Sequence, residues 1–169
     1  LPRIIECFDI SNLGTEHVVS GMVAFKDAKP DKKNYRKFKI KTFTGQDDFA
    51  SMNEVVTRRY KRQIEEKAQL PDLVVIDGGP GQVHAAKMAL EKLGLKMPLI
   101  GLAKEREEIF LPDDSAPHSF DKNSRMMLLL RKIRDATHDF SLGYNRKRRQ
   151  MKTREEFKPL KKNSKRVDA

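Results

Sequence analysis

Residues 73–81 read LVVIDGGPG, an apolar run followed by an aspartate and a glycine-rich turn. A short, continuous apolar run favours a strand that is buried on both faces, as in a parallel sheet. The turn ends that strand, and residues 85–93 then follow the pattern of a helix. A strand, a tight turn and a helix in this order predict one step of a parallel α/β sheet.

Three strands are predicted upstream of this step. Residues 3–10, RIIECFDI, predict a buried strand that ends near Asp9. Residues 17–26 predict a second strand, and residues 35–43, YRKFKIKTF, alternate apolar and basic side chains at the two-residue period of a third. We expect an antiparallel meander with one basic face exposed to water.

A helix is predicted after Gly45, where apolar side chains recur at helical spacing; they are Met52, Val55, Val56, Tyr60 and Ile64. Asp47, Asp48 and the Ser51/Glu54 pair are candidates for capping its first turn. The meander is therefore expected to lead directly into a helix.

Downstream of the turn, residues 98–103 predict a fifth strand and residues 113–121 a loop. An amphipathic helix of about five turns is predicted next, marked by Met126, Leu129, Leu130, Ile133, Ala136 and Phe140, with the core ending near Tyr144. This order of elements is that of an α/β, RNase H-like fold with a mixed five-stranded sheet. We expect one domain over residues 1–146 and a flexible basic tail over 147–169.

The charge balance favours a polyanionic partner, nucleic acid first of all. The chain has 35 Lys and Arg against 24 Asp and Glu, a net charge of +11. Residues 146–169 hold 11 basic and 3 acidic residues, a net charge of +8. The tail either contacts DNA or is a solvated, solubilising segment.

Composition also points to a compartment. The single cysteine, Cys7, excludes an intrachain disulfide and matches a reducing environment. No apolar run approaches the roughly 20 residues that cross a bilayer, and the N-terminus lacks the pattern of a signal peptide. We expect a soluble, cytoplasmic protein that does not contact a membrane.

Three aspartates are candidates for chemistry. Asp9 and Asp77 are expected to end buried strands, and Asp48 to open a helix. A carboxylate at the end of a buried strand is costly to desolvate unless it is paired or binds a metal, so adjacent Asp9 and Asp77 would form a hard-metal site. Taken singly, each could instead cap a helix or a turn.

A polar stripe is predicted on the last helix, where Arg131, Arg134 and His138 fall on one face. His138 alone would be an ordinary surface or packed histidine. The sequence has no motif for nucleotide binding, zinc binding or acyl transfer. Residues 76–82, IDGGPGQ, match neither a Walker A sequence nor GxGxxG, and no zinc-ligand spacing or nucleophile elbow is present. Carboxylate chemistry on phosphates remains.

Five ordered blocks resemble the C-terminal nuclease domains of the UvrC family: ECFDISN, YRKFKIKT with GQDDFASMNEVVTRRY, PDLVVIDGGPGQ, GLAKEREEIF and RKIRDATHDF. The resemblance covers roughly residues 3–149. It implies a metal-dependent DNA endonuclease that cuts on the 5′ side of a lesion in nucleotide excision repair. It also implies Mg²⁺ or Mn²⁺ as cofactor, damaged double-stranded DNA as substrate, and UvrA-type and UvrB-type partners acting through a longer protein.

The resemblance matches the catalytic positions to four residues: Asp9, Asp48, Asp77 and His138. Two cations about 3.5–4 Å apart would activate water and stabilise the leaving oxygen. Asp9 would bridge them, Asp48 and Asp77 would complete their shells, and His138 would bind metal or handle a proton. Asp9 and Asp77 should then lie within about 8 Å of each other.

Basic residues are expected to contact the DNA backbone. Lys104 matches a basic position near the family's site, and Arg134 would neutralise phosphate charge beside it. Further contacts are expected from the third strand, from the tail with Arg146, and from the first helix, which carries Arg58, Arg59 and Arg62. Without the family's GIY-YIG, UvrB-interacting and helix-hairpin-helix parts, the chain is expected to be an excised, monomeric fragment.

The sequence departs from the family pattern at Pro80, Ala136 and Asn145, which replace a lysine, an acid and a histidine. None of these positions is a proposed metal ligand, so the departures bear on substrate contacts. Two rival hypotheses stay open. One is a catalytically idle RNase H-like module that binds DNA or protein, and the other is an enzyme acting on RNA hybrids or junctions.

Overall fold

A mixed sheet forms the centre of the protein, in a computed structural model that describes residues 1–13, 17–42 and 47–156. The sheet order is β3-β2-β1-β5-β6-β7-β8, and β4 also pairs with β2. Its strands are β1 (Ile4–Leu13), β2 (His17–Lys26), β3 (Lys29–Pro30), β4 (Arg36–Lys39), β5 (Leu73–Ile76), β6 (Leu99–Leu102), β7 (Ile109–Leu111) and β8 (Asp114–His118).

Pairing directions follow the predicted order of elements. β1 pairs antiparallel with β2, and β2 with β4, whereas β1 pairs parallel with β5 and β5 with β6. The mixed α/β class is confirmed. The predicted number of five strands is wrong, because the described sheet has eight.

The additional strands are short and lie at the edges of the sheet. β3 spans two residues, and β7 and β8 form an antiparallel hairpin beyond β6. Residues 113–121 were predicted to be a loop, yet Asp114–His118 is a strand. Polar residues and Pro117 are tolerated there because an edge strand leaves one row of its backbone groups unpaired. Residue composition alone therefore hid this strand.

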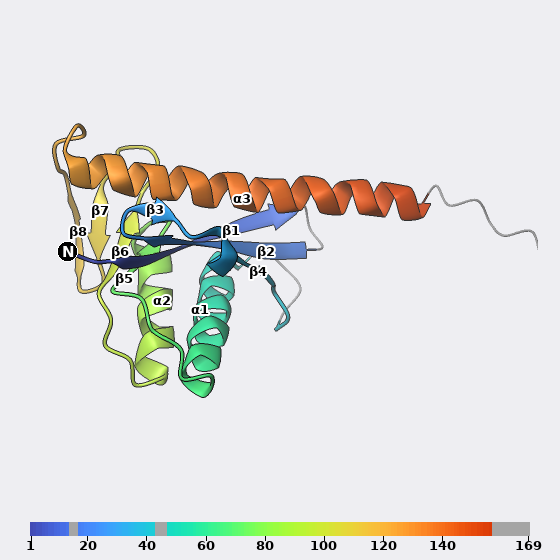
Figure 1. Cartoon of the computed structure of the whole chain (residues 1–169), viewed down its shortest axis with the longest axis horizontal. Helices are drawn as coiled ribbons and strands as arrows, with labels where there is room; N and C mark the ends of the chain where they lie inside the picture. The colour runs from blue at the N-terminus through green and yellow to red at the C-terminus, as the bar shows by residue number, and fades with distance from the viewer. Residues whose placement is uncertain (14–16, 43–46, 157–169) are drawn as a thin grey trace, which may run out of the picture.

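Helices cover both faces of the sheet (Figure 1). The helix α3 (Arg125–Glu156) lies across one face, and α1 (Asp48–Glu65) and α2 (Pro80–Lys92) lie on the other. A 3-10 turn, η1, spans Lys32–Asn34. α2 begins five residues before its predicted start, since proline has the fixed φ of a first helical position and needs no donor there.

Each face buries its own apolar cluster. Phe8, Met22 and Ile76 pack toward α1 and α2, with Val55 and Ala86 from those helices. Alternate residues of the same strands turn to the other face, because side chains along a strand alternate sides. There, a second set packs under α3: Cys7, Val23, Val75, Met127, Leu130 and Ile133.

The last helix is longer than the predicted five turns. α3 runs over 32 residues to Glu156, so the predicted domain boundary at 146/147 falls inside a helix and no break marks it there. The remainder of the predicted tail, residues 157–169, lies outside the described residues. In the described part of the chain, no helix is long and apolar enough to cross a membrane.

Candidate metal site and its surroundings

Asp77 stands directly after β5, where the chain turns into α2. Its backbone N–H donates to the carbonyl of Phe8 at 2.9 Å, which extends the pairing of β5 with β1 by one residue. Gly78 follows and closes the turn, its N–H donating to the carbonyl of Ile76 at 3.0 Å. The carboxylate is thereby held at the carboxyl edge of the parallel strands, where it is only 5% exposed.

Asp9 lies inside β1 rather than at its end, contrary to the prediction. β1 continues to Leu13 by pairing with β2, in which Asp9 faces Gly21. Its pairing with β5 does stop just before Asp9, at Phe8. Alternation along the strand sends the Phe8 side chain toward α1 and α2 and that of Asp9 toward α3. Asp9 thus reaches the same edge as Asp77.

His138 of α3 completes a group of three possible metal ligands. One ligand atom from each of Asp9, Asp77 and His138 lies within 4.8 Å of the others. His138 Nδ1 is 3.6 Å from Asp9 Oδ2. The predicted proximity of Asp9 and Asp77, within shared-metal reach, is confirmed.

Lys104, in the loop between β6 and β7, contacts two members of this group. Its Nζ is 3.6 Å from Asp77 Oδ2 and 3.4 Å from His138 Nδ1. The side chain is 53% exposed, so it bridges the buried carboxylate and the solvent. A cation in this position can contact a phosphate while it faces Asp77.

Burial has the largest effect on the pKa of both carboxyl groups. It raises the pKa of Asp9 to about 6, reinforced by the charge of Asp77 and opposed by Lys104 and His138. Burial also raises the pKa of Asp77, against the opposing charges of Lys104, Arg134 and His138. Two desolvated acids side by side favour a divalent cation, which would neutralise both.

The hydrogen bonding of Asp77 supports this fit. Both of its carboxylate oxygens are buried, and neither has a hydrogen-bond partner. Buried carboxylate oxygens are usually hydrogen-bonded in folded proteins, so a side chain whose two oxygens accept no hydrogen bond in the described part of the chain, with the Lys104 ion pair at 3.6 Å, fits a bound cation. Two carboxylate oxygens and one imidazole nitrogen suit manganese or magnesium.

Glu107 is a site-neighbouring residue that the sequence analysis missed. Its Oε1 is 3.1 Å from Arg131 Nε and 3.8 Å from Arg134 Nη2, so it ties the loop of Lys104 to α3. Arg134 is only 13% exposed and also pairs with Asp135 at 3.3 Å. Nothing in a run of charged residues distinguishes this acid from its neighbours, because its partners are more than 20 positions away.

Asp48 is the first residue of α1, on the face of the sheet opposite α3, and is half-buried. Asp47 is the N-cap, accepting from the backbone N–H groups of Phe49 at 3.0 Å and Ala50 at 2.9 Å. Of the candidates for capping this helix, Asp47 is the one confirmed in that role. Asp48 is outside the three-ligand group found among the described residues, and its role as a ligand stays a prediction.

The arginines predicted to contact DNA occupy different environments. Arg58 donates to the carbonyl of Lys39 at 2.7 Å and to Glu54 at 3.0 Å. Arg62 is 72% exposed beside Glu66, and Arg146 is exposed on α3. These three are accessible to a ligand at least in part.

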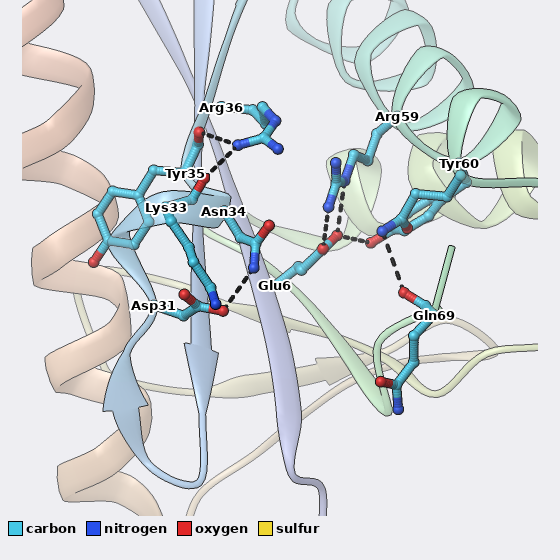
Figure 2. A network of polar contacts seen from close by, with 10 residues as sticks. Glu6, Asp31, Lys33, Asn34, Tyr35, Arg36, Arg59, Tyr60 and Gln69 are labelled. Atoms are coloured by element: carbon cyan, nitrogen blue, oxygen red, sulfur yellow. Dashed lines mark hydrogen bonds and ion pairs between the residues drawn. The ribbon is translucent and has the colours of Figure 1, made fainter. Parts of the chain in front are cut away.

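Arg59 is not accessible, and its assignment to DNA is withdrawn. The residue is 9% exposed, and its Nη2 is 2.6 Å from Oε1 of Glu6, which is itself buried in β1. Figure 2 shows the Glu6 carboxylate between Arg59 and Tyr60, whose hydroxyl donates to it at 2.9 Å. Arg59 therefore holds α1 to the sheet.

Comparisons with known proteins agree with this architecture. Residues 1–142 match the family model of the UvrC RNase H endonuclease domain. The UvrABC system protein C of Methanospirillum hungatei is 49% identical over 154 residues, which are 91% of this chain and 30% of that protein. The Methanococcus maripaludis protein of the same name is 52% identical over 145 residues, 86% of this chain and 28% of that protein.

A solved structure supports the fold alone. Human ENDOV superposes with a TM-score of 0.51 at 9% identity, over 85% of this chain and 86% of that one. The chain spans about 30% of the length of the first of the curated relatives it matches. The family match and the two relatives lead to one conclusion: the chain belongs to the UvrC RNase H endonuclease domain family.

Proposed function

We propose that this domain is a divalent-metal-dependent DNA endonuclease that hydrolyses a phosphodiester on the 5′ side of a lesion in nucleotide excision repair. The observation that carries the proposal is the pair of buried Asp77 oxygens, neither of which accepts a hydrogen bond, beside the buried carboxylate of Asp9. Membership of an endonuclease domain family supports the reaction class. The side of the incision and the repair pathway follow from the resemblance and rest on it.

Asp9, Asp77 and His138 would hold the cation, with Asp48 of α1 as the proposed fourth ligand. When bound, Mg²⁺ or Mn²⁺ supplies an activated water and charge stabilisation for an in-line displacement at phosphorus. Asp9 and Asp77 fix the position of the reacting centre because both emerge from adjacent paired strands. His138, at the accessible side of the group, either binds the metal ion or transfers a proton.

The proposed phosphate contacts divide by exposure. Lys104, more than half exposed and facing Asp77, would bind the phosphate nearest the reacting centre. Arg58, Arg62 and Arg146 would contact the backbone further away. Arg134 is nearly enclosed by acidic partners, so we assign it to stabilising the charge of Asp77 rather than to a phosphate.

The larger assembly is a proposal as well. The resemblance to the UvrC family implies damaged double-stranded DNA as substrate and UvrA-type and UvrB-type proteins as partners, and the matched region is less than a third of the two relatives' length. We propose that this domain takes part in that assembly as a monomer. Its own residues would catalyse the cleavage and contribute part of the non-specific affinity for DNA.

The test is cleavage of damaged and undamaged duplex DNA in manganese by wild-type protein and by Asp9→Asn, Asp77→Asn and His138→Ala. Asp113→Asn is the matched control, because that side chain is 78% exposed on the surface. We expect wild type and the control to cut and the three site variants to lose cutting. Undiminished cutting by the site variants would contradict the proposal.

A second measurement separates an inactive fragment from an idle site. A metal ion present at a free concentration of 100 times its Kd stabilises the folded state by about 2.7 kcal/mol. Manganese should therefore raise the Tm of wild type and of Asp113→Asn. Asp77→Asn should lose that rise while keeping its metal-free Tm. A wild-type protein that neither cuts DNA nor responds to manganese would favour the idle binding module.

A further inference from the structure

Phe49 is an exposed aromatic side chain that packs beside the turn after Asp77. It lies in the first turn of α1, next to Asp48, and is 57% exposed. One edge of its ring lies on the backbone of Gly81, where an added Cβ would stand only 2.5 and 2.7 Å from ring atoms Cε1 and Cζ. Gly81 follows Asp77 by four residues, so the ring is placed beside the turn that carries this ligand.

The usual structural reasons for an apolar side chain at a helix start do not account for Phe49. Asp47 already caps α1 through its side chain. A hydrophobic staple would join the residue before the cap to the fourth helical position, which is Ser51 here, whereas Phe49 is at the second position. Gly81 lies against one edge of the ring, and the residue is 57% exposed.

Phe120 offers a comparison within the same chain. It is also about half exposed, at 49%, but it borders an apolar groove with Leu111, Met126 and Arg3 at the start of β1. Asp9 is six positions after Arg3 along the chain, about 20 Å at the rise of a β-strand. An isolated exposed aromatic has no necessary function, so the contact of Phe49 with Gly81, in the turn that follows Asp77, is the informative feature.

We infer that Phe49 stacks on a nucleobase of the DNA strand whose phosphate lies at Asp9, Asp77 and His138. The inference rests on the proposed function. Bases present a π-face of the kind that aromatic side chains bind in single strands. In an intact duplex both faces of a base are covered by its neighbours, so the ring selects a nucleotide that is unpaired or displaced from the stack. Lys104 would bind the phosphate, and Phe49 would bind the base.

The chain contains no tryptophan, so Phe49→Trp introduces a single fluorescent reporter whose emission a stacked base quenches. Phe120→Trp is the matched control. Both keep Asp77 and are measured with calcium in place of manganese, because calcium binds carboxylate oxygens while the DNA stays uncut. The probes are a duplex with a central unpaired bubble, the same bubble with abasic sugars, and a fully paired duplex.

We expect the bubble to quench the Phe49→Trp reporter, the abasic bubble and paired duplex to quench it much less, and the Phe120→Trp reporter to respond to none of them. Phe49→Leu, which keeps apolar contact with Gly81, should bind the bubble about 5- to 150-fold more weakly, the range of stacking on one base. Its affinity for the abasic bubble should be unchanged, and Phe49→Tyr should bind like wild type.

The outcomes separate the inference from the proposed function. Binding of the bubble, seen by anisotropy of labelled DNA, without quenching of the Phe49→Trp reporter would overturn the stacking and leave the nuclease standing. Equal quenching by the normal and abasic bubbles would overturn it too, because the phosphates alone would account for the change. Absence of binding to every probe would overturn the proposed function and the inference together.

Discussion

Replacing Arg59 with methionine tests the buried ion pair that distinguishes this residue from its exposed neighbours. In the wild type, the guanidinium of Arg59 donates to Glu6 at 2.6 and 3.3 Å, and the Glu6 side chain is 3% exposed. Methionine fills much of the same space without charge, so Glu6 would remain buried with only the hydroxyl of Tyr60 as a partner.

Removing one partner of a buried ion pair costs about 3–5 kcal/mol, because the other charge is left uncompensated. The bond retained from Tyr60 favours the lower end of that range. At about 2–4 °C per kcal/mol for a chain of this size, the Tm should fall by roughly 6–20 °C. Glu6→Gln combined with Arg59→Met keeps an acceptor for Tyr60 and removes both charges, so most of the loss should be recovered.

Urea and thermal unfolding measure the effect, with Arg62→Met as the control. Arg62 is exposed and pairs with Glu66 one turn along the same helix, and such solvent-exposed pairs contribute little to stability. The salt dependence of DNA binding is the second readout. Each phosphate contact contributes about −0.9 to the slope of the logarithm of the binding constant against the logarithm of the salt concentration. A Tm within about 2 °C of wild type, with a slope reduced by about 0.9, would show that Arg59 faces DNA and that the burial argument is wrong.

Two further predictions concern packing and pH. Gly101→Ala should lower the free energy of unfolding in urea by about 1–3 kcal/mol and should reduce cleavage. The added Cβ would meet the side chain of Val83, and it would stand 3.0 Å from the carbonyl oxygen of Gly78, the residue after Asp77. Unchanged stability and cleavage would contradict this prediction. Partial burial raises the pKa of Glu54, but hydrogen bonds from Thr42, Lys41 and Arg58 outweigh it and hold the pKa below its usual 4.5. The bonded carboxylate therefore stabilises the fold fully above pH 4.5 and loses that contribution as pH falls below it, so acid unfolding curves should show a steeper decline for wild type than for Glu54→Gln. Equal declines would contradict the assignment.

Much of the fold was predictable because its signals are local. The apolar run before Asp77 and the glycines after it define a strand and a turn without reference to the rest of the chain. Asp47 was predictable as a cap because its partners, the N–H groups of Phe49 and Ala50, lie two and three residues away. β8 was not, since five polar and small residues form a strand there only because β7 offers an edge to pair with.

The candidate site was predictable in its aspartates and histidine but not in its surroundings. Asp9 and Asp77 follow apolar runs, and parallel pairing of those runs brings the two carboxylates together. Glu107 and Phe49 have no such signal: one is an acid in a charged loop and the other an apolar residue in a helix. Their positions beside Arg134 and Gly81 follow from the packing of elements far apart in sequence.

The sequence by itself determined the succession of the central strands and helices along the chain and marked Asp9 and Asp77 as ligand candidates, because periodicity and turn residues act over a few positions. The resemblance to the UvrC family added His138. Only the tertiary structure decided which charges are buried. Arg59 and Arg62 stand three residues apart on one helix, yet one is paired with Glu6 inside the protein and the other is in water. The partner of Arg59 is 53 positions away, and the cost of burying a charge is set by such distant partners rather than by the residue itself.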